Sequence, residues 1–194
     1  MAINLKYFLK HGIIYGISNV AVKASGIILL PLYTGHLPLG EFGVLGLIDA
    51  AIIILIEVIS LGQGQALVML NNSPEYSIKR KSIFFTISSL TFFICLVFTI
   101  FGYFAIPIIV DAYAFKDIYI IYLRIALFVI SLRTINNIFL NKLRADEESV
   151  KFTSVNIIKL TILIIAASYL LIEMEMGLLG ILYAYVISES FTFI

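Results

Sequence analysis

Ionisable side chains interrupt the long apolar runs of this 194-residue chain. They are Lys23, Asp49, Glu57, Arg124, Arg133, Lys159 and Glu189. A charge at the centre of a bilayer costs roughly 2.5–3.5 kcal/mol on insertion scales, so each of these groups needs a partner or a wet cavity. Charged groups at such depth are typical of paths for charged substrates or ions.

The depths of these residues can be estimated at about 1.5 Å of helix per residue. Lys23 and Glu57 then fall near the middle of two neighbouring helices, where they can pair. Arg133, Lys159 and Glu189 reach a comparable level in later helices. Two interpretations stay open: the charges lock helices together as buried pairs, or they line an aqueous cavity.

Helical spacing favours the cavity for the second group. Asn136 and Asn137 follow Arg133 by three and four positions, so they share its helix face. Asn156 precedes Lys159 by three. Arg124 is nine residues from Arg133, which places it on the opposite face, near the outer boundary.

The predicted site therefore has three kinds of residue. The substrate-binding cations are Lys23, Arg133 and Lys159; the counter-charges or coupling groups are Glu57 and Glu189; the polar lining is Asn136, Asn137 and Asn156.

Six apolar runs must position these residues, and they predict an all-α integral membrane protein. The runs are 12–33, 42–70, 82–106, 118–140, 152–172 and 177–194. A spanning helix needs about 20 predominantly apolar residues. Hydrophobic residues make up 61% of the chain and charged residues 13%, whereas soluble domains are about a quarter charged.

Basic residues alternate between the connections and predict the orientation. Eight of them flank the runs on one side: Lys6, Lys10, Lys79, Arg80, Lys81, Lys142, Arg144 and Lys151. Only Lys116 falls in the connections on the other side. Because basic loops stay in the cytoplasm, we expect a cytoplasmic N-terminus.

The stretch Gly62-Gln63-Gly64-Gln65 is unusual within the second run. Two glycines and two amides predict a locally loosened backbone that faces protein or water, because lipid cannot satisfy its polar groups.

Several functions are disfavoured by what the sequence lacks. The only histidines, His11 and His36, fall on opposite sides of the membrane, and Cys95 is the single cysteine. No zinc-protease pattern, phosphate-binding loop or nucleophile elbow is present. We expect no enzyme, no metal, no cofactor and no nucleic-acid partner.

Ordered sequence fragments resemble the N-terminal half of Wzx-type lipid-linked oligosaccharide flippases, in the multidrug/oligosaccharidyl-lipid/polysaccharide (MOP) exporter superfamily with its MATE-like fold. The fragments are Gly26–Tyr33, Glu41–Gly43, Ser60–Leu67, Leu143–Glu147, Gly177–Leu182 and Ser188–Glu189. The similarity runs over most of the chain.

The resemblance implies two six-helix lobes around a cavity that opens alternately to each side. The chain would then be a fragment or half of a transporter, without the C-terminal lobe. The implied cargo is an undecaprenyl-pyrophosphate-linked glycan, an O-antigen or capsular repeat unit. The implied location is the bacterial cytoplasmic membrane, beside a polysaccharide polymerase and chain-length machinery.

Two alternatives remain. A cation-coupled multidrug exporter of the same superfamily would favour acidic residues in the cavity. A non-transporting membrane scaffold would pair every buried charge and contain no cavity.

Overall fold

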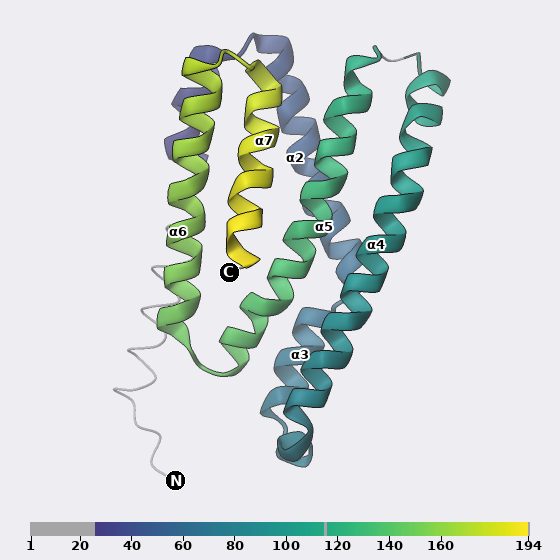
Figure 1. Ribbon diagram of the computed structural model, residues 1–194, viewed down its shortest axis with the longest axis vertical. Helices are drawn as coiled ribbons and strands as arrows, with labels where there is room; N and C mark the ends of the chain where they lie inside the picture. The colour runs from purple at the N-terminus through teal and green to yellow at the C-terminus, as the bar shows by residue number, and fades with distance from the viewer. Residues whose placement is uncertain (1–25, 115, 194) are drawn as a thin grey trace.

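The computed structural model describes residues 26–114 and 116–193, which form a bundle of helices (Figure 1). A helical segment, 26–36, precedes the labelled elements. These are α2 (Leu39–Ser60), α3 (Gln63–Asn72), α4 (Arg80–Ala112), α5 (Ile118–Ala145), α6 (Ser149–Ser168) and α7 (Gly177–Ser190). Short helical turns cover Pro74–Lys79, Tyr169–Glu173 and Phe191–Phe193. Lys23, Lys6, Lys10 and most of the first expected span lie outside the described residues.

The second expected helix is broken in two at the glycine–glutamine stretch. Leu61 and Gly62 both adopt left-handed backbone, with φ of 47° and 71°, and separate α2 from α3. Gly62 suits this conformation because it has no Cβ. The expected loosening of the backbone is confirmed.

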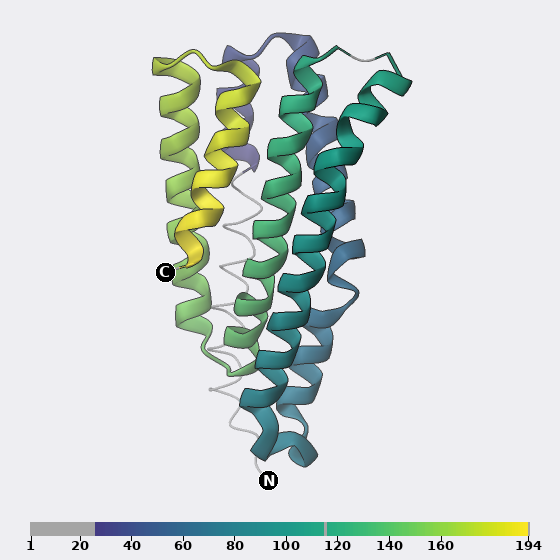
Figure 2. The ribbon, with the colours of Figure 1, turned by 45° about the vertical axis from the view of Figure 1, so that its right-hand side comes forward.

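Helix α5 is the central element of the bundle. It packs against α2, α3, α4, α6 and α7. Figures 1 and 2 show it running obliquely between α4 on one side and the α6–α7 pair on the other. A residue on α5 can therefore face several helices, and Arg133 lies on this helix.

A carboxylate fixes where α7 begins. Glu41, in the first turn of α2, accepts a hydrogen bond from the Leu178 backbone N–H at 3.0 Å through Oε2. The first N–H groups of a helix have no partner within it, and negative charge is favourable there. Glu41 thus ties α7 to α2 and sets the depth at which the later residues of α7 lie.

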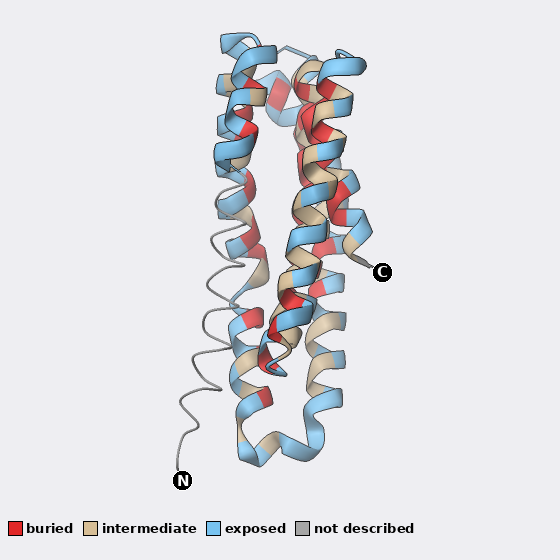
Figure 3. Ribbon diagram, turned by 90° about the vertical axis from the view of Figure 1, so that its left-hand side faces the viewer, coloured by how far each residue is buried: buried red, intermediate tan, exposed pale blue. Residues whose placement is uncertain are grey.

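The outer surface is strongly apolar. Helix α4 exposes many large side chains, and Figure 3 shows buried positions gathered on the inner helix faces. Among the described residues, four helical stretches are long and apolar enough to cross a membrane: Leu39–Ser60, Pro74–Ala112, Ile118–Ala145 and Ser149–Glu173. The chain is a multi-pass membrane protein.

The sixth expected span is shorter than predicted. Helix α7 has 14 residues, or about 21 Å, against a hydrocarbon core of about 30 Å. Figure 1 shows it ending midway along the bundle. Four spans are thus found by length where six were expected. The run 177–194 forms a helix that is too short, and the run 12–33 lies mostly outside the described residues.

The connections that carry most of the basic residues lie at one end of the bundle, as expected, and the others lie at the opposite end. The turn between α3 and α4, with Lys79, and the α5–α6 connection lie at the lower end in Figure 1. The α4–α5 and α6–α7 connections lie at the upper end. The cytoplasmic assignment of the basic end stays a prediction.

Candidate functional site

A buried carboxylate joins three helices in the middle of the bundle. Glu189, at the end of α7, is 0% exposed. Its Oε1 lies 2.6 Å from Nε of Arg133 on α5, and its Oε2 lies 2.6 Å from Nζ of Lys159 on α6. We call Arg133, Lys159 and Glu189 the ion triad.

Asn136 supports the triad from behind. Its side-chain nitrogen donates to the backbone oxygen of Glu189 at 2.9 Å, to Glu189 Oε2 at 3.0 Å and to Thr192 Oγ1 at 2.6 Å. Asn136 is buried and does not line the adjoining cavity. The prediction that it forms part of the polar lining is wrong: it faces the end of α7, where it positions Glu189.

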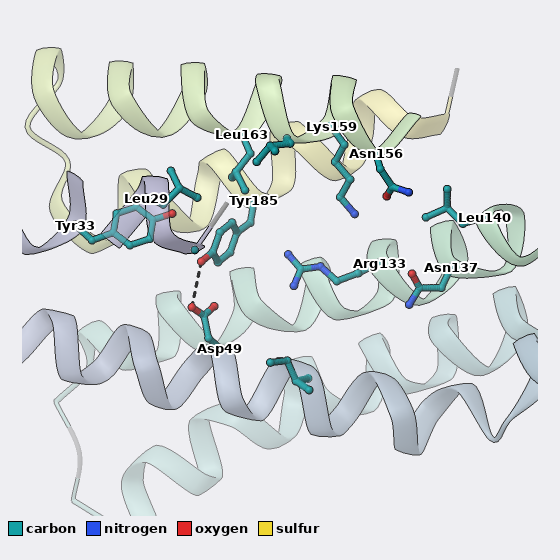
Figure 4. Close-up of a pocket in the computed structure, with 13 residues that line it drawn as sticks. Leu29, Tyr33, Asp49, Arg133, Asn137, Leu140, Asn156, Lys159, Leu163 and Tyr185 are labelled. Carbon is teal, nitrogen blue, oxygen red and sulfur yellow. Dashed lines mark hydrogen bonds between the residues drawn. The ribbon is translucent and has the colours of Figure 1, made fainter. Parts of the chain in front are cut away.

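The two cations of the triad face an open cavity of about 520 Å3, the central cavity (Figure 4). The side chains of Arg133 and Lys159 are 25% and 19% exposed. Asn137 and Asn156 also line this cavity, whereas Glu189 does not. The central cavity therefore presents two cations, with their shared carboxylate behind them.

An acidic group stands at the other side of the same cavity. Asp49 on α2 accepts a hydrogen bond from the Tyr185 hydroxyl at 3.2 Å. The Arg133 guanidinium lies over the Tyr185 ring, 5.4 Å from its centroid, and Tyr33 completes this wall. Figure 4 shows Tyr185 next to both Asp49, which it contacts through its hydroxyl, and Arg133.

Sequence reasoning did not include Asp49 or Tyr185 in the site. By its position near the start of the run 42–70, Asp49 is close enough to the outer surface for hydration to be as good an explanation as function. Helix α2 and helix α7 begin at the same end, and these residues lie about 15 Å and 12 Å along them. With both helix starts known, the comparable depths of Asp49 and Tyr185 would have predicted that the two residues can meet.

Glu57 lies apart from the triad. It is exposed, about 27 Å along α2 and close to the helix break, so it lies deeper toward the basic end than the predicted mid-membrane position. It lines a second cavity with Gln65, Asn141 and Arg144. The expected pairing with Lys23 lies outside the described residues.

Arg124 is separated from the central cavity, as its spacing predicted. Its guanidinium carbon lies 4.1 Å from the centroid of the Tyr103 ring on α4. From its position near the outer boundary, Arg124 could either extend to the membrane surface or pair with Asp111 or Asp117. No such ion pair forms among the described residues, and a cation–π contact is found instead. Among the described residues no cluster of potential metal ligands is found.

The fold matches that of a known class of membrane transporter. No family model matches the chain, and no curated protein matches it. Among solved structures it is similar to a multidrug resistance MATE family transporter of the MOP superfamily, in an outward-facing conformation, with a TM-score of 0.68 and 18% sequence identity. The likeness covers 94% of this chain and 40% of that one. The chain thus has a MATE-like helical fold and spans less than half the length of the transporter it matches.

Proposed function

We propose that the chain forms one lobe of an alternating-access transporter that carries an anionic, lipid-linked oligosaccharide across a membrane. The observation that supports this proposal is the charge arrangement of the central cavity. Arg133 and Lys159 face the cavity, whereas the carboxylate that they share is fully buried.

The ion triad carries one more positive than negative charge. A ligand that enters the cavity meets the two cations first, because Glu189 lies behind them. Electrostatic attraction is stronger in such a site than in water. A pyrophosphate offers several charge-assisted hydrogen bonds, and the planar guanidinium of Arg133 can bind two of its oxygens together.

The finer identity follows from the sequence resemblance. A polyprenyl-pyrophosphate-linked glycan combines an anionic group with a sugar and a long apolar tail. The cations would bind the diphosphate, while the tail would stay beside the apolar outer surface. In this proposal the chain acts in the bacterial cytoplasmic membrane, and a polymerase and chain-length machinery use the product.

A second function is favoured by Asp49. A carboxylate beside Tyr185 in the same cavity suits an organic cation or a coupling ion. The transporter of similar fold is described as a multidrug resistance protein. A cation-coupled multidrug exporter is therefore the competing proposal.

Transport in proteoliposomes separates the two functions. The cargo is a fluorescent polyprenyl-pyrophosphate glycan in one set and a fluorescent organic cation in the other. Arg133→Ala and Lys159→Ala should slow glycan transport by roughly 10- to 100-fold, the value of a hydrogen bond to a charged group. Lys151→Ala is the matched control, because this exposed lysine of α6 pairs with Glu148 and with no other described residue.

The opposite pattern would favour the exporter. The flippase proposal would be overturned if the unaltered protein transported the organic cation but not the glycan, and if Asp49→Asn abolished transport of the cation. Equal losses in Lys151→Ala and Lys159→Ala would also count against it, since only Lys159 faces the cavity.

A further inference from the structure

A second polar cavity opens at the break between α2 and α3. Its volume is about 200 Å3. Its polar wall consists of Glu57, Ser60, Gln65, Asn137, Asn141 and Arg144, with Thr134 behind them. We call this cavity the notch. The left-handed residues Leu61 and Gly62 create it, because they interrupt the helix and leave a step beside α5.

Most polar side chains of the notch have no partner in the described part of the chain. The side chains of Glu57, Gln65, Asn137 and Asn141 form no hydrogen bond or ion pair with a described residue. Arg144 lies over the Phe152 ring, 5.1 Å from its centroid, and its donors stay available. Unsatisfied polar groups are costly in hydrocarbon, so the notch holds water or a polar ligand.

The notch is continuous with the central cavity along one face of α5. Asn137 lines both cavities. Arg133 lies one helical turn to one side of it and Asn141 one turn to the other, about 6 Å each along the axis. A ligand anchored on the triad therefore reaches the notch if it extends by one or two sugar rings.

Gly64 leaves room for the Asn141 amide, and Thr134 adds an acceptor to the wall of the notch. Gly64 is buried, and a Cβ built on it would overlap the Asn141 amide nitrogen, so only glycine permits this contact. Thr134 donates its hydroxyl hydrogen to the Ile130 carbonyl at 2.8 Å. The Thr134 oxygen keeps acceptor capacity toward the notch, and the surrounding amides supply donors.

We propose that the notch binds hydroxyl groups of the glycan, as a sugar subsite beside the diphosphate site of the triad. This inference rests on the proposed flippase function and adds a second contact region to it. Amide side chains donate and accept at once, which matches sugar hydroxyls that also do both. About 200 Å3 holds six or seven waters at roughly 30 Å3 each, and one pyranose ring can take their place while keeping their hydrogen bonds.

Other ligands fit the notch less well. Glu57 is its one carboxylate, and the described residues contain no cluster of potential metal ligands. An anion would meet Glu57 beside Arg144. An acyl chain would leave the carboxylate and the amides unsatisfied.

Cysteine protection tests the binding directly. Ser60→Cys places a thiol in the notch, and Ser82→Cys places one outside it toward the same basic end. The natural Cys95 is 2% exposed and serves as an unreactive background. The probe is the oligosaccharide pool released by mild acid from the polyprenyl-linked lipids of cells that make the protein, freed of phosphate. Thiosulfonate labelling of Ser60→Cys should slow with increasing probe concentration c by the factor 1 + c/Kd, about tenfold at roughly ten times the Kd.

Labelling of Ser82→Cys should not change. Equal labelling of Ser60→Cys with and without the sugars would overturn the subsite. Leu160→Cys, in the central cavity, tests the anion site separately, with inorganic pyrophosphate as its probe. If pyrophosphate did not protect Leu160→Cys while the sugars still protected Ser60→Cys, the proposed function would be contradicted and the sugar subsite would be supported.

Transport of lipids with different head groups gives a second measurement if Ser60→Cys does not fold. Asn141→Ala and Glu57→Gln should slow transport of a polyprenyl-pyrophosphate oligosaccharide about five- to tenfold and leave transport of the polyprenyl pyrophosphate that carries no sugar unchanged. Arg133→Ala should slow both. An equal effect of Asn141→Ala on both lipids, or none on either, would overturn the proposal.

Discussion

Replacing Glu189 by Gln should destabilise the bundle strongly, because it removes the one carboxylate that two cations share. Both pairing distances are 2.6 Å, and the carboxylate is 0% exposed. In Glu189→Gln the charges of Arg133 and Lys159 face each other without compensation. Two unit charges about 5 Å apart repel by roughly 3 kcal/mol at an effective dielectric constant of about 20.

Hydration limits this cost, since both cations reach the central cavity. We therefore expect about 3 kcal/mol, the lower part of the roughly 3–5 kcal/mol found when a buried pair loses one partner. For a chain of this size each kcal/mol shifts Tm by about 2–4 °C, so the expected fall is about 6–12 °C. Thermal unfolding of the purified protein in detergent measures it.

The sharper test is an asymmetry within the triad. Lys159→Gln leaves Arg133 paired with Glu189 and removes the excess positive charge, so Tm should fall by no more than about 2 °C. The control Glu148→Gln breaks an exposed pair with Lys151 and should change Tm by less than about 2 °C. If Lys159→Gln and Glu189→Gln lowered Tm equally, the idea of one carboxylate between two cations would be refuted.

Three further predictions concern packing. Gly64→Ala should lower the free energy of unfolding by about 1–3 kcal/mol through overlap with the Asn141 side chain, and adding Asn141→Ala should recover most of the loss, as denaturation of the single and double variants would show. Thr99→Val removes the 2.6 Å hydrogen bond to Ser131 between α4 and α5 and should cost about 0.6 kcal/mol, at most about 1.7, by the same measurement. Cys95 should react with a maleimide only after unfolding, and rapid labelling of the folded protein would contradict its burial.

The helix break and the principal cations of the site could be predicted from local pattern. Glycines and amides at 62–65 marked the interruption that the structure places at Leu61–Gly62. The spacing of Arg133 and Asn137 placed both on one face of α5, and both line the central cavity. These properties depend on a single helix, so periodicity is enough to detect them.

Properties that depend on two helices were harder to predict. Asn136 and Asn137 are adjacent in sequence, yet Asn136 faces Glu189 and Asn137 faces the cavity, since α7 covers only part of α5. The role of Asp49 depends on Tyr185, on a helix 136 positions away in the chain. Glu57 was placed too centrally because the start and end of α2 each differ from the expected run.

The length of α4 has a consequence for where water meets the protein. Its 33 residues extend for about 50 Å, whereas the hydrocarbon layer is about 30 Å thick. If the upper loops mark one surface of that layer, roughly 20 Å of α4, with α3 beside it, stands clear of the lipid as a short stalk. The stalk begins about where α2 breaks, so water on the side of the basic loops wets the step between α2 and α3 before any transport cycle starts.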